Sequence, residues 1–398
     1  MDYSNINFVS DNIIQGKAYP ALARWTAQPY THKWRQFVQH WPNTVPMELY
    51  EHLNTHSIPY RLYDLNDNNY PRGSYYGIGI GFFNFDVDYF ALLNDDVFFG
   101  LQSGRIRALF YYHEGDNPDK IKQRLDHLCD LNNLPPNCYK FISGNTQADA
   151  IENFIYFPDH ELLYWHRNQQ TEPTQIHSNS RPYNFTVLSR THKWWRATVM
   201  TDLRRAGLLD NCLWSYGTDV ALNEHETDNP IEVDTLDIRS DIADFLSNGP
   251  YTCDEFTIEQ QNNHHLTETS HYTDSYCNIV LETHFDADGS GGAFLTEKTF
   301  KPVKHGQPLV IVGCPGSLAA LRNLGYRTFD HAIDNSYDTI TDNTQRWLAV
   351  KAAIAKIQSQ NLHTWFESCR KDIEHNQQLF LGSKSSRLNT LLERLRND

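Results

Sequence analysis

The segment IRALFYYHEGDNPDKIKQRLDHLCDLNNLPPNCYKFIS, residues 106–143, carries the alternation that decides the fold. It opens on an apolar and aromatic run that is typical of a strand. A polar loop follows, after which Ile121, Leu125 and Leu128 recur at the spacing of one helix face. Two adjacent prolines then turn the chain into a second strand, YKFIS. A strand, a helix and a strand in this order predict an α/β domain of Rossmann type.

The same alternation starts again in the C-terminal half of the chain. Strands are expected at 183–190, 275–285 and 308–313, and helices at 192–209 and over much of 339–395. The stretch LWSYG at 213–217 is a further expected element, whose type is left open. Ser317 is expected to cap the helix LAALRNL, which follows the last of these strands. In the N-terminal half, the Gly- and aromatic-rich stretch at 73–90 fits either a strand or a loop.

A polar, proline-containing stretch at residues 168–182 lacks periodicity and is the expected linker. We therefore expect two Rossmann-like domains, at residues 1–175 and 182–398, the second ending in helices. Two such domains joined by a linker form the GT-B plan. Because ligands of open α/β sheets lie at the carboxyl ends of the strands, the site is expected in a cleft between the domains.

The composition is that of a soluble globular protein: of 398 residues, 40% are hydrophobic and 21% are charged. The net charge of −15 argues against broad, non-specific binding of nucleic acid, which needs a basic surface. The seven cysteines form no CxxC pair or disulfide framework and are expected to be reduced thiols. The N-terminus lacks the pattern of a signal peptide, and no apolar run approaches the ~18 residues of a membrane span. A cytoplasmic location is therefore expected.

A charge pair, Glu297 and Lys298, stands in FLTEKTFKPVKHGQPLVIVGCPGS, residues 294–317, shortly before a strand-like run. Proline is tolerated in the first turn of a helix, so Pro302 and a capping Thr299 would place the pair in a loop at the helix mouth. A cation beside the free N–H groups there suits a phosphate, whereas Glu297 suits the hydroxyl groups of a ribose. A solvated ion pair on a loop is the alternative.

The longer stretch NIVLETHFDADGSGGAFLTEKTFKPVKHGQPLVIVG, residues 278–313, resembles the signature of family 10 glycosyltransferases, the α-1,3-fucosyltransferases. That family has a strand, a T-E-K motif, a helix and an apolar strand in the same order. The stretches at 187–217 and 316–329 are similar to glycosyltransferase-like proteins of large phages and viruses. The resemblance implies a GT-B fold and an inverting, metal-independent transfer of a sugar from a nucleotide diphosphate donor.

The resemblance also assigns roles to residues. In the fucosyltransferases the Glu of T-E-K contacts the donor ribose and the Lys contacts the diphosphate. These roles fall on Glu297 and Lys298, with Thr296 as the first residue of the motif. An Arg near the start of the family's C-terminal domain also binds the diphosphate; its best match is Arg190, and Arg196 is the second choice.

The chain departs from the family at two places near this motif. Lys301-Pro302-Val303 stands where the family usually has Arg-Asn-Ala, and GSGGAF at 289–294 replaces a segment that often holds Ser and an Asp-Tyr pair. These departures bear on the donor's sugar and base more than on the diphosphate. Glu282 and His284, at the end of the strand IVLETHF, are candidates for contacts with that base or sugar.

Inverting transfer needs a carboxylate that deprotonates the acceptor hydroxyl. Glu114 follows the strand at 106–112, and Gly115 beside it permits a sharp turn. The family's base is likewise a Glu in an N-terminal loop after a strand, so Glu114 is the expected base, with His113 and Asp116 as neighbouring substitutes. A capping or solvating role for Glu114 at the following helix is the alternative.

The expected function is thus an inverting glycosyl transfer from a GDP- or UDP-linked sugar. No metal or other cofactor is expected, because no DxD motif stands in its usual context and His264 and His265 lack further ligands. The acceptor is a glycan or a hydroxymethylated base in phage DNA, and clustered basic residues keep the second open: Arg181, Arg190, Lys193, Arg196, Arg204 and Arg205. No membrane partner is expected, and a phage-encoded protein would act in the host cytoplasm. The alternative from another class is a non-catalytic nucleotide-sugar-binding protein on a GT-B scaffold.

Overall fold

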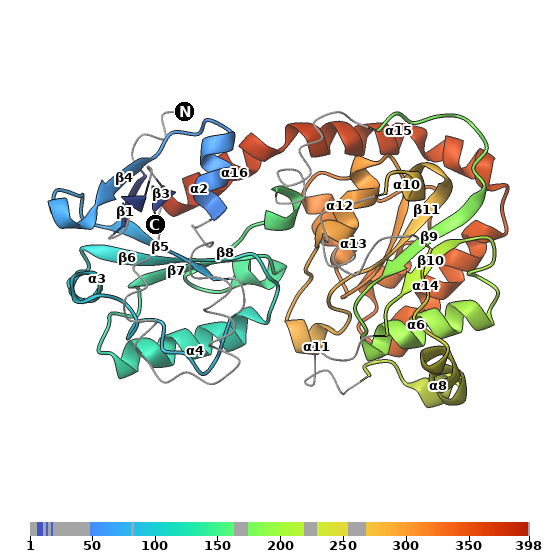
Figure 1. Ribbon diagram of the computed structural model, residues 1–398, viewed down its shortest axis with the longest axis horizontal. Helices are drawn as coiled ribbons and strands as arrows, with labels where there is room; N and C mark the ends of the chain where they lie inside the picture. The colour runs from blue at the N-terminus through green and yellow to red at the C-terminus, as the bar shows by residue number, and fades with distance from the viewer. Residues whose placement is uncertain are drawn as a thin grey trace. The chain divides into compact units, whose positions relative to one another are not determined.

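A computed structural model describes most of the chain (Figure 1). The described residues are 6–10, 13–14, 17–18, 48–80, 83–162, 174–218, 229–253 and 268–396. His264, His265 and residues 168–173 of the predicted linker lie outside these ranges.

The chain divides into two compact units, and each is described by itself. Unit 1 comprises Met1–Asp159 and Lys384–Asp398, and unit 2 comprises His160–Ser383. The chain therefore passes between the units twice, whereas the sequence predicts a single passage at 168–182.

Unit 1 is built on a sheet of six parallel strands. In spatial order these are β4 (Arg61–Asp64), β1 (Asn7–Ser10), β5 (Ser74–Ile80), β6 (Ile106–Tyr112), β7 (Tyr139–Ser143) and β8 (Phe154–Tyr156). The predicted strands at 106–112 and 139–143 are confirmed. Both are nearly continuous buried runs, which is the pattern of parallel strands. A short antiparallel pair, β2 (Ile13–Ile14) and β3 (Lys17–Ala18), also belongs to this unit.

The helices of unit 1 are α2 (Glu48–Thr55), η1 (Leu65–Asp67), α3 (Asp95–Gln102), α4 (Pro118–Leu131), η2 (Thr146–Ala150) and α16 (Lys384–Arg396). Asn117 caps α4, and Pro118 follows at the first helical position, where its missing N–H is not needed. Ile121, Leu125 and Leu128 form the buried face of this helix, as predicted.

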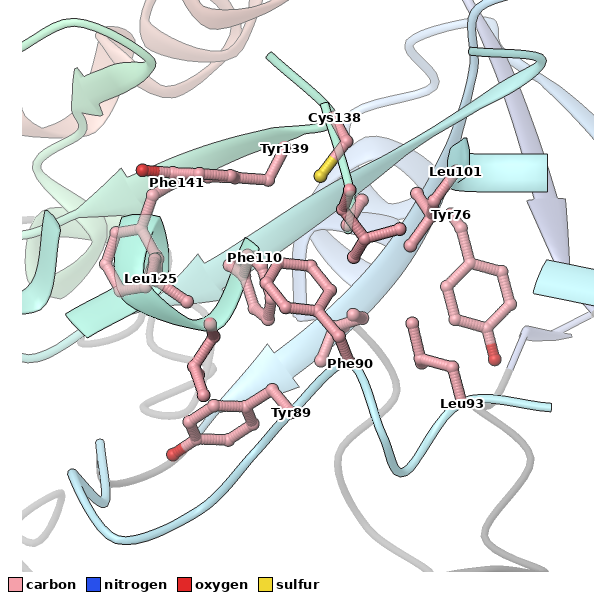
Figure 2. Close-up of a cluster of buried hydrophobic side chains, with 14 of the residues drawn as sticks. Tyr76, Tyr89, Phe90, Leu93, Leu101, Phe110, Leu125, Cys138, Tyr139 and Phe141 are labelled. Atoms are coloured by element: carbon pink, nitrogen blue, oxygen red, sulfur yellow. The ribbon is translucent and has the colours of Figure 1, made fainter. Parts of the chain in front are cut away.

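The core of unit 1 is rich in aromatic rings (Figure 2). Phe110 of β6 contacts Phe141 of β7, with ring centroids 5.9 Å apart. Tyr89 and Phe90 pack on the same Phe110 ring at centroid distances of 6.0 and 5.8 Å. Both come from the stretch at 73–90, which contains strand β5 and, from residue 83 on, turns that fill the core.

The last helix, α16, completes this unit from the far end of the chain. Its apolar side chains Leu388, Leu391, Leu392 and Leu395 are buried. The Tyr75 hydroxyl of β5 donates to the carbonyl of Leu395 at 2.9 Å. Unit 1 is therefore assembled from two separate segments of the sequence.

Unit 2 is built on four parallel strands, in the spatial order β10 (Leu213–Tyr216), β9 (Tyr183–Ser189), β11 (Ser275–Leu281) and β12 (Leu309–Val312). The strands β9, β11 and β12 lie within predicted strands, and β10 lies within the element expected at 213–217. The chain runs outward from β9 to β10 and then continues on the other side of β9 with β11 and β12. The strand order therefore reverses between β9 and β11, and open α/β sheets bind ligands at the carboxyl ends of such a pair.

Helices pack on this sheet: α12 and α15 contact β11, and α14 contacts β12. The helices of unit 2 are α6 (Trp194–Arg205), α7 (Val233–Leu236), α8 (Arg239–Ser247), α10 (Ser270–Thr273), α11 (Ala287–Ser290), α12 (Glu297–Lys304), α13 (Ser317–Asn323), η3 (Ser336–Thr339), α14 (Asn343–Gln358) and α15 (Leu362–Gly382). Among the helices that the structure describes in either unit, none is long and apolar enough to cross a lipid bilayer.

The predicted cap of α13 is wrong. Ser317 is the first residue of the helix, and the preceding Gly316 takes the capping position without a side chain. The amides of Leu318 and Ala319 donate instead to the carboxylate of Asp338, at 2.8 and 2.9 Å. A carboxylate at a helix N-terminus satisfies these amides and complements the helix dipole, so the cap comes from a distant part of the chain.

Two parallel sheets with packed helices confirm the predicted α/β class with two Rossmann-like domains. The cleft between the domains and the boundary at 175–182 stay predictions.

Candidate functional site

The predicted site residues Glu282 and His284 directly follow β11, and Arg190 directly follows β9. Both strand ends lie where the strand order of unit 2 reverses. The register of the two strands brings their last residues, Ser189 and Leu281, level with one another. Arg190 therefore emerges beside Glu282 and His284 at the carboxyl edge of the sheet. The sequence alone could place these residues at strand ends but could not pair the two strands.

The T-E-K motif forms the start of α12, but not as predicted. Thr296 caps the helix: its backbone is extended, and its side-chain oxygen accepts from the Lys298 amide at 3.4 Å. Glu297 and Lys298 are consequently the first two helical residues instead of loop residues, and the expected cap Thr299 is wrong. Pro302 lies inside the helix, which ends two residues later.

Glu282 explains why Thr299 is not the cap. Its buried carboxylate accepts the Thr296 amide at 3.0 Å, the Thr296 hydroxyl at 2.7 Å and the Thr299 hydroxyl at 2.5 Å. The Thr283 amide is a fourth donor, at 3.1 Å. The two threonine hydroxyls are thus turned toward Glu282, which fastens the start of α12 to the end of β11.

The Lys298 ammonium is held by three acceptors around it. Its Nζ lies 3.2 Å from Thr296 Oγ1, 3.3 Å from Thr283 Oγ1 and 3.3 Å from Glu297 Oε1. The side chain is still 31% exposed. The site therefore presents a positioned but accessible cation at a helix N-terminus, a combination that suits an anionic ligand.

The Glu297 carboxylate is ionised although it is almost buried. Its second oxygen lies 3.4 Å from Nδ1 of His160, and its first contacts Lys298. Burial raises the pKa of Glu297, but Lys298, His160 and Lys301 outweigh that effect and hold the pKa well below its usual range. Glu297 in turn raises the pKa of Lys301. Burial outweighs this effect and lowers the pKa of Lys301 to about 8.

Further positive charge gathers around His284. Burial lowers the pKa of His284 to about 3, and the nearby charges of Lys193, Arg196 and Lys298 act in the same direction. The imidazole is therefore neutral at physiological pH. Arg196 is itself buried and donates to the backbone carbonyl of Glu282 at 2.6 Å, so it ties α6 to the end of β11.

In unit 1, Glu114 lies just past β6 and is 27% exposed. Its carboxylate is 3.5 Å from Nε2 of His113, and its carbonyl accepts from the Gly144 amide at 3.1 Å, which fixes the loop to the end of β7. The following helix is capped by Asn117, so the alternative that Glu114 caps it is wrong. Asp116, the other expected substitute, accepts a hydrogen bond from the Tyr112 hydroxyl.

One buried carboxylate near this loop was not predicted from the sequence. Asp159 follows β8 and accepts hydrogen bonds from the Tyr111 hydroxyl and from Nε2 of His52, the latter at 3.1 Å. Burial raises the pKa of Asp159, but the bond and charge of His52, together with His113, lower it overall. Neither Asp159 nor His160, which contacts Glu297, stands in a motif, so no local signal could have found them.

The six basic residues that favour a DNA acceptor are partly engaged within unit 2. Arg181 is buried and donates to the carbonyls of Tyr272 and Ser275, both at 2.7 Å. Arg205 donates to the carbonyl of Asp237 at 2.5 Å, and Arg204 donates to a tyrosine hydroxyl. Within the described ranges, no group of three or more His, Cys, Asp or Glu side chains is arranged to hold a metal ion.

No protein-family model and no curated protein sequence matches the chain. Among solved structures, it is similar to T4 phage BGT in complex with UDP and Mn2+, with 9% identity, a TM-score of 0.38 and 98% of both chains covered. It is also similar to the DNA-modifying enzyme β-glucosyltransferase, solved with and without uridine diphosphoglucose, with 11% identity, a TM-score of 0.40 and 98% of both chains covered. A third structure is an α,α-trehalose-phosphate synthase (UDP-forming) from Burkholderia vietnamiensis, with 9% identity, a TM-score of 0.35 and coverage of 92% of this chain and 81% of that chain. These similarities are low, so any function must be argued from the chain's own residues.

Proposed function

We propose that this protein is an inverting, metal-independent glycosyltransferase of GT-B type that moves a sugar from a nucleoside diphosphate to an acceptor hydroxyl. The observation that carries the proposal is the gathering of basic side chains where the strand order of unit 2 reverses: Arg190, Lys193, Arg196, Lys298 and Lys301. A diphosphate carries several negative charges, and the carboxyl edge of a parallel sheet beside a helix N-terminus is where such groups bind.

On this proposal the donor's two phosphates lie against Lys298 and Arg190, and Arg196 adds positive charge from the buried side. Glu297 accepts hydrogen bonds from the ribose hydroxyls, for which an ionised carboxylate is well suited. Glu282 has its carboxylate occupied by four donors, so its part is to position Thr296 and Lys298. His284 is neutral and adds no charge to the phosphate site, so we assign it a contact with the sugar or the base.

The reaction itself is a single displacement. The acceptor oxygen forms a bond to the anomeric carbon while the bond from that carbon to the diphosphate breaks. Glu114 takes the proton of the acceptor hydroxyl, and the departing diphosphate keeps the electron pair. The cations of unit 2 stabilise the charge that develops on this leaving group, which is the main electrostatic contribution.

The acceptor is a glycan hydroxyl or the hydroxymethyl group of a modified DNA base. The net charge of −15 and the internal contacts of Arg181, Arg204 and Arg205 favour the glycan. Fucose is one candidate sugar, as the T-E-K motif suggests, and GDP and UDP are both candidate carriers.

The test measures donor binding and turnover separately. Thermal shift with GDP-fucose, GDP-mannose, UDP-glucose and UDP-arabinose is expected to identify one donor, and Lys298→Ala is expected to abolish that shift. With this donor, Glu114→Gln is expected to lower the rate of transfer or donor hydrolysis by a factor of about 100 or more while leaving donor affinity unchanged.

Other results would point elsewhere. Stabilisation by none of the four donors would count heavily against the proposal. Binding without any turnover would favour a non-catalytic nucleotide-sugar-binding protein, and unchanged turnover in Glu114→Gln would remove Glu114 as the base.

A further inference from the structure

Trp194 is a large aromatic side chain that unit 2 leaves in contact with solvent. It is the first residue of α6, and 38% of it is exposed. The helix follows the loop after β9, one of the two strands between which the sheet order reverses. Trp194 therefore stands at the same edge of the sheet as Arg190 and the start of α12.

The ring is held in place by a short chain of contacts. Trp194 lies edge-to-face against His192, with ring centroids 5.1 Å apart and planes at 80°. Nδ1 of His192 is 2.9 Å from the hydroxyl of the buried Tyr216, at the end of β10. The same hydroxyl donates to the carbonyl of Lys193 at 3.2 Å. The loop that carries Trp194 is thus fastened to the next strand, so the exposed ring is positioned before any ligand arrives.

Positive charge gathers at the same edge of the sheet. Lys193 directly precedes Trp194, and its charge acts on His284 together with the charges of Arg196 and Lys298. A ligand whose phosphates reach these cations would bring its adjoining groups to the edge of the sheet where Trp194 is presented. An exposed indole at this edge offers a flat apolar face to such a ligand.

We propose that Trp194 stacks on the nucleobase of the donor. This inference rests on the proposed function, because it assumes that the ligand of the cationic site is a nucleoside diphosphate. Every base has a π-face, so stacking on an aromatic ring contributes to affinity for purines and pyrimidines alike. The phosphates and the base are then bound by different side chains, and the two contributions are separable by experiment.

The experiment compares ligands with and without a base. Isothermal titration calorimetry would measure the binding of UDP, GDP and inorganic pyrophosphate to the full-length chain. Trp194→Ala is expected to weaken UDP and GDP binding by a factor of about 5 to 150, the range for losing one stacked base, and to leave pyrophosphate binding unchanged. Trp194→Phe is expected to restore most of the loss. Phe99→Ala, which removes a 61% exposed ring on α3 of unit 1, is the matched control and should alter none of the three affinities.

Each other outcome has a definite meaning. If Trp194→Ala leaves UDP and GDP binding intact while Lys298→Ala weakens it, the stacking role is overturned and the proposed function stands. Equal weakening of pyrophosphate and nucleotides by Trp194→Ala would also overturn it, because the residue would then support the fold of the loop. If the unaltered protein binds none of the three ligands, the proposed function fails, and the stacking role fails with it.

Discussion

At the scale of single residues, the site depends on charges that are kept in spite of burial. Glu297 retains its negative charge because Lys298, His160 and Lys301 surround it. Lys301 has a weaker hold on its proton, since burial lowers its pKa to about 8. A bound anion would raise the pKa of Lys301, because a negative ligand favours the protonated ammonium.

The lowered pKa of Lys301 predicts how the affinity for UDP and GDP depends on pH. In the free protein Lys301 is charged below about pH 8 and loses its proton above it. A diphosphate binds the charged form best, so affinity for UDP or GDP is expected to fall as the pH rises through 8. Lys301→Arg keeps its charge across this range and should remove the fall. Calorimetric titrations at a series of pH values would check this; the same fall in Lys301→Arg would assign the proton to another group.

At the scale of elements, the start of α12 is decided by a side chain outside the helix. Thr296 and Thr299 are both suitable caps by residue type, and the sequence favoured Thr299 because Pro302 then falls in the first turn. Glu282 settles the choice because it accepts the Thr296 backbone amide as well as the two hydroxyls, and so fixes Thr296 at the helix start. The helix begins earlier as a result, and Pro302 is accommodated inside a short helix at the loss of one backbone hydrogen bond.

The exchange Glu282→Gln tests this arrangement. Each carboxylate oxygen accepts one backbone amide and one threonine hydroxyl, so the NH2 of a glutamine would face a backbone N–H that it cannot accept from. Each buried donor left without an acceptor costs about 1–3 kcal/mol, so a clear loss in the free energy of unfolding is expected. Hydrogen exchange should also show faster exchange of the Thr296–Lys298 amides. Thr299→Val, which removes one donor and leaves the carboxylate, should lower the free energy of unfolding by less. Equal losses in the two variants would contradict the positioning role of Glu282.

Local patterns predicted some elements well and could not predict others. The strands β6 and β7 and the helix α4 are predicted by an apolar run, a proline-rich turn and a periodic repeat of Ile and Leu. Each of these patterns determines the structure of the residues in which it occurs. The caps of α12 and α13 depend on Glu282 and Asp338, which come from other parts of the chain. The same holds for the site: the T-E-K motif is visible in the sequence, but the contact of His160 with Glu297 arises only from tertiary structure.

At the scale of the whole molecule, the chain passes between the units after Asp159 and after Ser383. The unit 2 residues at both points are joined by one side chain. Glu161 is fully buried and accepts from the Tyr326 hydroxyl at 2.6 Å and from the Ser383 hydroxyl at 2.5 Å. The residues that flank the two passages are therefore held together. Unit 1, in turn, includes α16, whose leucine side chains are buried.

Shortening a buried leucine of α16 should weaken unit 1 selectively. Leu392 is fully buried, and Leu392→Ala is expected to cost about 2–5 kcal/mol of that unit's stability through lost contacts and a cavity. Hydrogen exchange should then show reduced protection in β5 and β6 with little change in β9 and β11. Ser385→Ala, on the exposed side of the same helix, should leave both units unchanged. Equal loss of protection in the two sheets would mean that they unfold as one.

The return of the last helix to unit 1 has a consequence for the order of synthesis. Unit 2 occupies one continuous segment, so all of its residues are available once Ser383 has been made. Unit 1 begins to emerge first, yet it lacks Leu388–Leu395 until the ribosome has passed Ser383. Unit 1 is therefore completed on the ribosome only after all of unit 2 has been made, although its first residues are made before those of unit 2.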